Sequence, residues 1–255
     1  MEFIKKNMCN ISVLCIYNKR DIFESQLNSS LKEQDVLLDI VGIDNTNNQF
    51  ASAAEAYNYA VDEWAKGDIL IFAHQDIILK EPDALGKFAE AIMEMPIGTI
   101  LGGAGAKACE KKNIGNYTSG SVYRKECVQN VSNITEVNIV DEVIFGMRRE
   151  TFQLHHFDSR LCNNWHLYAA EMCLYFHAQG HSVYVFPLQF HHFSNGVISK
   201  EYMQGFVQLC DTYRAHEKYI WTTCYKVRNS FLGIRLLYHA WMMNRKLRKI
   251  IKRVK

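Results

Sequence analysis

Apolar and polar positions alternate in blocks through the first part of the chain. Short apolar runs at Ile11–Tyr17, Leu37–Ile43 and Ile69–Ala73 have the length and composition of buried strands. The stretches between them, Ser25–Gln34 and Ala51–Lys66, carry apolar residues at helical spacing. Strands and helices in alternation predict right-handed crossovers and a largely parallel sheet, so we expect an α/β fold.

The second part of the chain continues this alternation with a longer polar interruption. The irregular composition of Lys107–Asn138 predicts a loop region that is either mobile or faces an acceptor. Regular elements are expected on both sides of it. They are a helix over Pro82–Met95, a glycine-rich strand and turn over Ile97–Ala106, a strand over Val140–Arg148, a helix over Trp165–Gln179 and a strand over His181–Phe190.

The apolar run Ile69–Ala73 leads directly into the polar triplet His74-Gln75-Asp76. Open α/β sheets bind ligands at the carboxyl ends of such strands. A carboxylate at that place, two residues after a histidine, is suited to hold a divalent cation against a phosphate. The sequence therefore predicts Asp76 as a metal ligand, and a helix cap is the alternative role for this side chain.

The first two strands also end in polar turns. Asn18 follows the first strand, and Asp44 and Asn45 follow the second. Neighbouring parallel strands would place these side chains along one edge of the sheet, where a nucleotide could lie. A carboxylate there can accept hydrogen bonds from ribose hydroxyls or from a base N–H. The alternative is that Asp44-Asn45-Thr46-Asn47 forms only an Asx-type turn.

The chain contains neither of the glycine-rich phosphate-binding patterns, GxGxxG and GxxxxGK[ST]. This argues against a dinucleotide dehydrogenase and a P-loop NTPase. A bound diphosphate would then have its charge neutralised by a metal ion. His192, at the end of a late strand, is the second predicted metal ligand, because alternation along the strand sends only one of His191 and His192 to each face.

A carboxylate that could act as a general base lies in the late helix. Glu171 interrupts an otherwise apolar segment, and partial burial can raise the pKa of such a group until it accepts a proton from a hydroxyl. Asp141 and Glu142, at the start of the preceding strand, are a rival acidic pair. A solvated helix face is the alternative explanation for Glu171.

Charge is unevenly distributed along the chain. The net charge of +2 argues against a nucleic-acid partner, but no acidic residue follows Glu217. Residues 226–255 carry ten Lys and Arg side chains near aromatic and Met residues. We expect a domain over residues 1–225 and a basic amphipathic helical tail over 226–255. The tail is predicted either to contact an anionic membrane or to pack as a helix with a solvated basic end.

No targeting segment is visible in the sequence. The first residues lack a long apolar core with a cleavage site, and no window has the roughly 18 to 20 apolar residues that span a bilayer. A cytoplasmic location is therefore expected, with peripheral contact at the inner face of the cell membrane. The eight cysteines form no CxxC pair, so neither a zinc ribbon nor a disulfide framework is indicated.

From Ile11 to Gly196 these residues, in order, resemble glycosyltransferase family 2, the inverting nucleotide-sugar transferases of the GT-A fold. His74-Gln75-Asp76 stands where the family has an Asp-X-Asp motif whose last Asp binds the metal. Ala169-Ala170-Glu171 stands where the family has Glu-Asp or Asp-X-Asp. The other matching segments are Ser12–Asn18, Asp44-Asn45, Ala53–Asn58, Gly67–Ala73, Phe145–Glu150 and Phe157-Asp158.

The resemblance implies a Rossmann-like three-layer sandwich with a mostly parallel mixed sheet. It implies transfer of one sugar from a nucleoside diphosphate sugar, taken here as a UDP-sugar, because the Gln-X-X-Arg-Trp motif of processive members is absent. Asp76 would hold Mn²⁺ or Mg²⁺, and Glu171 would be the base. The residues implied to contact the donor are Tyr17, Asn18, Asp44, Asn45, Asn58, His74 and Gln75.

The expected acceptor is a hydroxyl of a saccharide or a lipid-linked saccharide in cell-surface polysaccharide synthesis. Two alternatives stay open. The chain could bind nucleotide sugars without catalysis on a degenerate transferase scaffold, since His74 and Ala169 replace residues that are often acidic. It could also be a nucleotidyltransferase, although Tyr17-Asn18-Lys19-Arg20 is a poor match to a glycine-rich phosphate loop.

Overall fold

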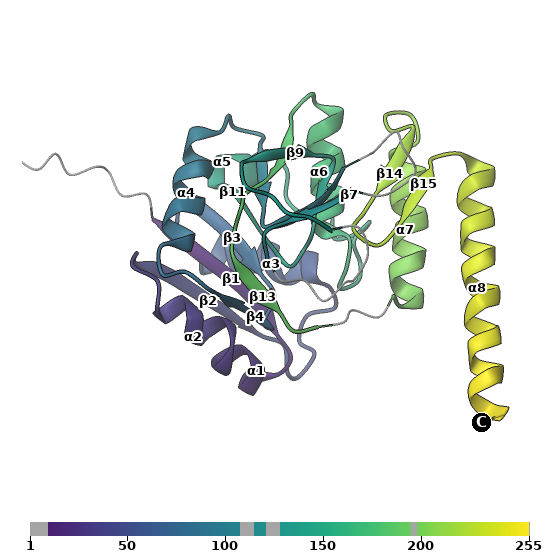
Figure 1. The fold of residues 1–255 in the computed structure, drawn as a ribbon, viewed down its shortest axis with the longest axis horizontal. Coiled ribbons are helices and arrows are strands. Elements are labelled where there is room, and N and C mark those ends of the chain that lie inside the picture. The colour runs from purple at the N-terminus through teal and green to yellow at the C-terminus, as the bar shows by residue number, and fades with distance from the viewer. Residues whose placement is uncertain (1–9, 108–114, 121–127, 195–197, 255) are drawn as a thin grey trace, which may run out of the picture.

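The centre of the molecule is a seven-stranded mixed sheet (Figure 1). The computed structural model describes residues 10–107, 115–120, 128–194 and 198–254. The strands of this sheet are β1 (Ile11–Tyr17), β2 (Leu38–Asp44), β3 (Ile69–Ala73), β5 (Ile100–Gly102), β9 (Thr135–Val137), β11 (Ile144–Arg148) and β12 (Val183–Val185). Their order is β2-β1-β3-β11-β5-β12-β9. Only β11 and β9 run against the other five, so the predicted mostly parallel sheet is confirmed.

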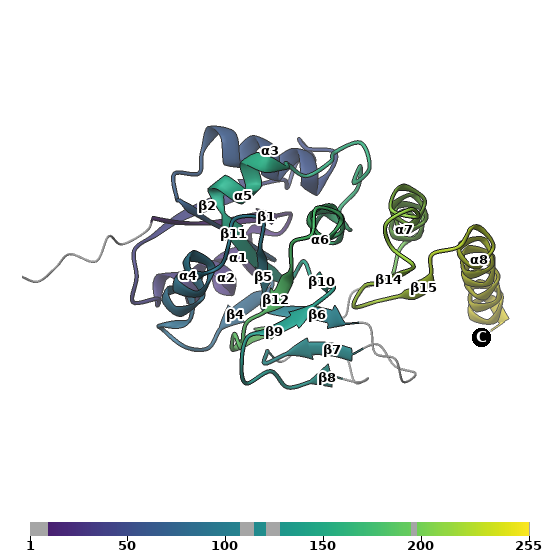
Figure 2. The same ribbon diagram turned by 90° about the horizontal axis from the view of Figure 1, so that it is seen from above.

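Helices cover both faces of the sheet and give three layers (Figure 2). Successive side chains of the central strands enter two different hydrophobic cores, with Val13 and Ile71 in one and Leu14 and Phe72 in the other. The first core is closed by α1 (Arg20–Ser25), α2 (Leu27–Lys32) and α4 (Ala84–Glu94). The second is closed by α3 (Ala53–Glu63), α5 (Arg149–Leu154), α6 (Tyr168–Ala178) and α7 (Lys200–Thr212).

Beside the central sheet, the described residues form three smaller sheets. One pairs β4 (Ile77–Leu79) with β13 (Phe190–His192), and another pairs β14 (Tyr219–Trp221) with β15 (Lys226–Arg228). The third, in the order β10-β6-β7-β8, contains β6 (Ala104–Lys107), β7 (Gly115–Thr118), β8 (Val128–Gln129) and β10 (Ile139–Val140). The last helix, α8 (Phe231–Val254), lies beside α7 at one end of the molecule in both views (Figures 1 and 2).

Two predicted elements have other bounds in the structure. The helix expected over Ser25–Gln34 is present as the shorter α2. Helix α1, which precedes it and is separated from it at Gln26 with a φ of −113° and a ψ of −84°, was not predicted. The single strand expected over Val140–Arg148 is wrong, because β10 and β11 are separated by Asp141–Val143. The N–H of Val143 donates to Asp141 Oδ1 at 3.1 Å and closes this turn.

The predicted strand His181–Phe190 is likewise two strands, β12 and β13. Pro187 lies between them, and proline has no N–H to donate to a sheet ladder. The predicted irregular region Lys107–Asn138 contains β7, β8 and β9, while residues 108–114 and 121–127 lie outside the described part. Residues 195–197, at the end of the family resemblance, also lie outside it.

Among the described residues, no helix is both long enough and apolar enough to span a bilayer. The described cysteines are free thiols. Strand β15 begins at Lys226, where the basic tail was expected to begin, and pairs with β14. The division of the chain into residues 1–225 and 226–255 stays a prediction.

Candidate metal centre and active-site pocket

The triplet after β3 is positioned by the two strands beside it. The N–H of His74 donates to the carbonyl of Val143 at 3.0 Å, which ties the end of β3 to the start of β11. Strand β4 then pairs antiparallel with β13, with His192 opposite Ile77. The N–H of Phe193 donates to the carbonyl of Asp76 at 3.1 Å. Residues more than a hundred positions apart are thereby held at the carboxyl end of β3.

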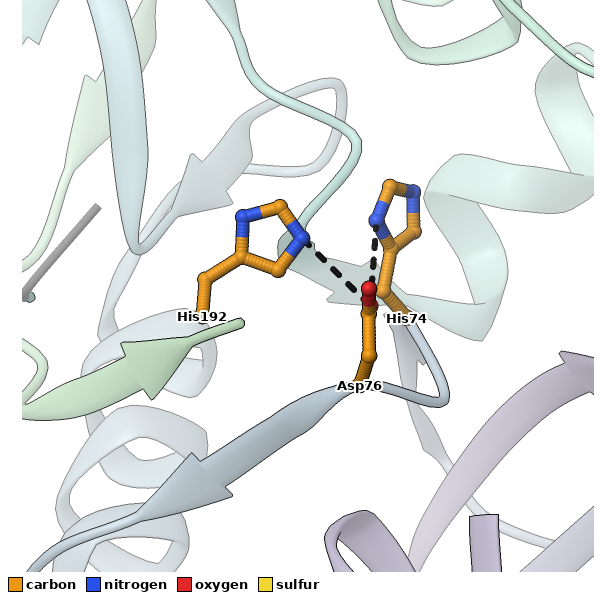
Figure 3. Close-up of side chains that lie close together, drawn as sticks. All are labelled: His74, Asp76 and His192. Carbon is orange, nitrogen blue, oxygen red and sulfur yellow. Dashed lines mark ion pairs between the residues drawn. The ribbon is translucent and has the colours of Figure 1, made fainter. Parts of the chain in front are cut away.

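His74, Asp76 and His192 converge at this strand end (Figure 3). Asp76 Oδ1 lies 3.4 Å from His192 Nε2 and 4.0 Å from His74 Nδ1. One potential ligand atom from each residue lies within 4.8 Å of the others. The structure therefore brings together the two predicted metal ligands and adds His74, which the sequence assigned only to the donor.

The donor set fits a divalent cation. Both ring nitrogens of His192 are buried. Nε2 faces the Asp76 carboxylate at 3.4 Å, and neither nitrogen makes a hydrogen bond of good geometry in the described structure. A buried polar atom without a partner is costly, and a bound cation would satisfy one of these nitrogens. Two imidazoles and a carboxylate are suitable ligands for transition-metal ions such as Mn²⁺.

The protonation states also suit metal binding. Burial lowers the pKa of His74, and the neighbouring imidazole of His192 lowers it further, which favours the neutral form that binds metals. Burial acts to raise the pKa of Asp76, but the adjacent His192 and His74 outweigh it, so the pKa of this carboxyl lies below its ordinary value. Asp76 is accordingly a carboxylate at neutral pH.

A pocket with a volume of about 210 Å³ opens beside this centre. His74 and His192 form part of its wall, and Asp141, Glu142 and His166 form another part. Tyr117 and Tyr202 also line it, so the pocket combines aromatic faces with polar groups. Such a surface can stack on a sugar ring and bond to its hydroxyls.

The two carboxylates in the pocket have different environments. Asp141 is occupied on both oxygens, since Oδ1 accepts from the N–H of Val143 and Oδ2 from the hydroxyl of Thr223. Glu142 Oε1 is buried and has no hydrogen-bond partner in the described structure, and Oε2 lies 3.9 Å from His166 Nδ1. Glu142 therefore has one carboxylate oxygen, Oε1, that no described hydrogen bond occupies.

Burial raises the pKa of Glu142 well above its ordinary value, and the negative charge of Asp141 adds to the increase. The backbone amides at the start of α6 oppose this shift, because a helix N-terminus favours the charged form. Leu167, the residue before α6, has a left-handed backbone with a φ of 73°. This uncommon conformation lies directly beside the pocket.

The polar ends of β1 and β2 lie side by side, as the sequence predicts, with Tyr17 aligned with Asp44. Asp44 Oδ2 accepts from Arg20 Nη2 at 2.5 Å, and Oδ1 accepts from the N–H and hydroxyl of Thr46 at 2.9 and 2.7 Å. These bonds, with those from Thr46 contributing most, lower the pKa of Asp44 to about 2. The carboxylate is ionised and faces an edge where a ribose could replace the arginine contact.

Gln75 links the nucleotide edge to the metal centre. Its Oε1 accepts from the N–H groups of Asn18 and Lys19 at 3.2 and 3.1 Å, and its Nε2 donates to Asn18 Oδ1 at 2.8 Å. The middle residue of the triplet therefore fixes the end of β1 relative to the end of β3. Gln75 positions the loop in this structure, and its direct contact with a donor stays a prediction.

Three other predicted donor contacts are engaged in structural bonds. The ring of Tyr17 is buried and stacks on Phe23 with ring centres 4.6 Å apart. Asn45 is buried, and its Oδ1 accepts from the N–H of Phe50 at 2.9 Å. Asn58 bonds to both backbone groups of Phe157, at 2.8 and 3.1 Å. Their roles toward a nucleotide stay predictions.

The structure does not bring Glu171 to the pocket. Its buried carboxylate accepts from the hydroxyl of Tyr213 at 2.7 Å, and His155 Nε2 lies 3.1 Å from both of its oxygens. Burial, together with this carboxylate, raises the pKa of the Tyr213 hydroxyl. Glu171 thus connects α6 to His155, which follows α5, and to Tyr213, which follows α7. It does not line the pocket.

We expect Glu171→Gln to reduce stability rather than catalysis. An amide in place of the carboxylate would leave either His155 or Tyr213 without its acceptor, which costs about 2 kcal/mol and lowers Tm by roughly 5 °C. Thermal unfolding would measure this loss, and turnover per folded molecule should stay within about twofold. A thousandfold loss of turnover with unchanged Tm would restore Glu171 as the base.

Sequence reasoning missed Arg20, His166 and Thr223 as participants in the site. Arg20 was considered only as a phosphate contact, whereas it pairs with Asp44. Thr223 contributes from the hairpin between β14 and β15, 82 positions after Asp141. No pattern in the nearby sequence predicts that Thr223 bonds to Asp141. Arg20 lies only a few residues after the end of β1, so its position could have identified it as a participant in the site.

The sequence matches the profile of a family described as "Glycosyltransferase like family" over residues 12–226. This range contains every site residue described above. The match confirms the family resemblance, although the His-Gln-Asp variant of the motif stays a prediction. No curated protein matches the chain.

Solved structures share the fold at low sequence identity. GalNAc-T7 with UDP, GalNAc and Mn²⁺ has a TM-score of 0.57 and 11% identity, and the match covers 81% of this chain and 48% of that one. The mannosyltransferase PcManGT from Pyrobaculum calidifontis, in complex with GDP-Man and Mn²⁺, has a TM-score of 0.57 and 15% identity, with coverages of 84% and 66%. S. aureus TarS 1–349 has a TM-score of 0.50 and 13% identity, with coverages of 81% and 66%.

These likenesses confirm the expected GT-A fold. Two of the structures are complexes with Mn²⁺ and a nucleotide or nucleotide sugar. This chain spans about half the length of the first and just under two thirds of the other two.

Proposed function

This chain belongs to the glycosyltransferase-like family, and on that premise we propose that it transfers one sugar from a nucleoside diphosphate sugar to a saccharide hydroxyl. The observation that carries the proposal is the meeting of His74, Asp76 and His192 at the edge of a pocket that Glu142 also lines. A metal centre and a partly buried carboxylate that line one pocket are the two groups that this reaction needs.

The donor would lie along the carboxyl edge of the sheet. Asp44, ionised and partly exposed at the end of β2, is placed to accept hydrogen bonds from the nucleoside. The bonds of Gln75 to Asn18 hold this edge beside the metal centre, so the diphosphate would reach Asp76 and His192. A divalent cation held there supplies positive charge that stabilises the departing diphosphate. We propose a UDP-sugar and Mn²⁺.

Glu142 is the proposed general base, in place of Glu171. As the acceptor oxygen bonds to the anomeric carbon, its proton passes to Glu142 and the bond from that carbon to the diphosphate oxygen breaks with its electron pair. A raised pKa suits this role, because a base is most effective when its pKa lies near the working pH. Asp141, fixed by Val143 and Thr223, maintains the negative field that raises the pKa of Glu142. Attack from the face opposite the diphosphate would invert the anomeric centre.

The proposed acceptor is a saccharide or a lipid-linked saccharide. The aromatic rings of Tyr117 and Tyr202 and the polar groups of the pocket support this choice. A cytoplasmic location at the inner face of the cell membrane and a role in cell-surface polysaccharide synthesis remain predictions. The basic composition of residues 226–255 is what supports them.

The proposal is tested by incubating the protein with a panel of nucleotide sugars, Mn²⁺ and saccharide acceptors, lipid-linked ones included. We expect nucleotide release that depends on one donor and on an acceptor, and a product whose anomeric configuration, read by NMR, is inverted. Calorimetry on the same donors separates the alternative. Tight binding of a nucleotide sugar without turnover on any acceptor would favour the non-catalytic binding protein.

A further inference from the structure

Helix α8 presents an exposed apolar stripe. Leu232, Leu236 and Met243 are 67%, 59% and 65% exposed, and their spacing of four and seven residues places them on one side of the helix. The opposite side packs on the body of the protein, where Ile234 is fully buried and Trp241 is partly buried. The stripe therefore faces away from the domain, consistent with the place of α8 beside α7 at one end of the molecule (Figure 2).

Cationic side chains flank the apolar stripe. Arg235 and Lys246 are exposed, and the guanidinium of Arg235 lies 3.9 Å from the centre of the exposed Phe231 ring. The sequence from residue 226 onward contains ten Lys and Arg residues and no acidic residue. The helix thus carries large exposed apolar side chains with the exposed cations Arg235 and Lys246 beside them.

The combination of apolar side chains and positive charge on α8 indicates which kind of partner fits this surface. A second copy of α8 would bring the positive charges of the two helices together, which opposes association. A neutral apolar partner would leave the cations unpaired. An anionic lipid surface accepts both components, because apolar side chains enter the boundary between headgroups and acyl chains while Lys and Arg contact the headgroups.

We propose that the outward side of α8, defined by Leu232, Arg235, Leu236, Met243 and Lys246, is a docking surface for an anionic membrane. At about 1.5 Å per residue, this helix of 24 residues is about 36 Å long, so it can lie along a membrane over several lipid headgroups. The β14–β15 hairpin, which lines the pocket with Thr222–Cys224, directly precedes α8. Docking would hold the pocket close to the lipid surface.

The test is co-sedimentation of the full chain with vesicles, without donor or acceptor, so its result is independent of the proposed transfer activity. We expect binding to vesicles that contain phosphatidylglycerol, weaker binding when salt is raised, and no binding to pure phosphatidylcholine. Leu236→Asp combined with Met243→Asp should weaken the binding by more than about tenfold, because two apolar contacts are replaced by charges that the surface repels.

The matched control places the same kind of change elsewhere on the surface. Leu37→Asp alters an 87% exposed leucine far from α8 in the sequence and should leave vesicle binding unchanged. Arg235→Gln combined with Lys246→Gln should weaken binding by on the order of tenfold, whereas Lys32→Gln combined with Lys66→Gln, with the same net charge, should not.

Two results would overturn the proposal. One is equal binding by the stripe variants and the wild-type protein. The other is a stripe variant that changes the molar mass measured by light scattering, with vesicle binding retained, since this result would assign α8 to contacts between copies of the chain. Circular dichroism of each variant confirms that the helix is still formed.

Discussion

Asp76→Asn should lower kcat/KM for sugar transfer by about a thousandfold or more. The expected loss corresponds to about 4 kcal/mol of transition-state stabilisation, which is in the range that a metal ion supplies to a departing phosphate oxygen. Asparagine keeps the size of the side chain but has no negative charge. Mn²⁺ would then lose the only carboxylate in the described cluster, and His192 and His74 alone would hold it weakly.

The measurement is nucleotide release under saturating Mn²⁺, with Mn²⁺ affinity determined in parallel by electron paramagnetic resonance. Asp83→Asn is the matched control, because Asp83 is an exposed carboxylate near the same segment whose described partner is Lys87. It should behave as wild type in both assays. Turnover by Asp76→Asn at the wild-type rate would refute the metal centre, and lost turnover with unchanged Mn²⁺ affinity would move the metal to other residues.

Glu142→Gln should reduce kcat by about a hundredfold to ten-thousandfold and leave donor affinity unchanged, because an amide cannot take the acceptor proton. The pH profile gives a second readout. In the wild-type protein, kcat/KM should fall as pH decreases through the raised pKa of Glu142, and the midpoint should lie well above 4.5. The residual activity of the variant should lack this decrease. Glu171→Gln is the matched comparison, since the same chemical change there is expected to affect stability alone.

The raised pKa of Glu142 also predicts how the stability of the folded protein changes with pH. The folded protein binds this proton more tightly than the unfolded chain, so the stabilisation is complete below the unfolded value and is lost as pH rises through the folded value. Glutamine has no proton to lose. The Tm of Glu142→Gln, relative to wild type, should therefore increase between acidic and alkaline pH, and a constant difference would contradict burial of this carboxyl.

The central part of the fold could be predicted from the sequence because its elements are locally encoded. Strand β3 has five consecutive buried residues, which matches its continuous apolar run, and its predicted bounds are the observed ones. The errors occur where a short interruption of up to four residues separates two elements. The break at Asp141–Val143 depends on a side chain bonding to a backbone N–H, and this competes with strand pairing without changing the apolar pattern.

The same break explains why the candidate base was difficult to choose. If Val140–Arg148 were one strand, Asp141 and Glu142 would point to opposite faces of the sheet. As a turn, the segment presents both to one pocket. The structure brings the side chains of His192 and Asp76, both predicted as metal ligands, close together, and strand alternation is the local rule that favoured His192 over His191. The burial of Glu171 against Tyr213 is set by the packing of α7, 42 positions later, and no local rule contains it.

The bond between Thr223 and Asp141 has a consequence for how the protein acquires its site during synthesis. The strand that precedes His74 and Asp76 is synthesised well before the hairpin that fixes Asp141, and His192 of the same cluster comes between them in the sequence. Contacts that span such long stretches of chain form late in folding. A nascent chain would therefore have the ends of β1, β2 and β3 before His192 joins the cluster and before Asp141 is fixed beside the proposed base, Glu142. On the proposed function, the edge that faces the nucleoside would form first, and the metal centre and the proton acceptor would be completed later.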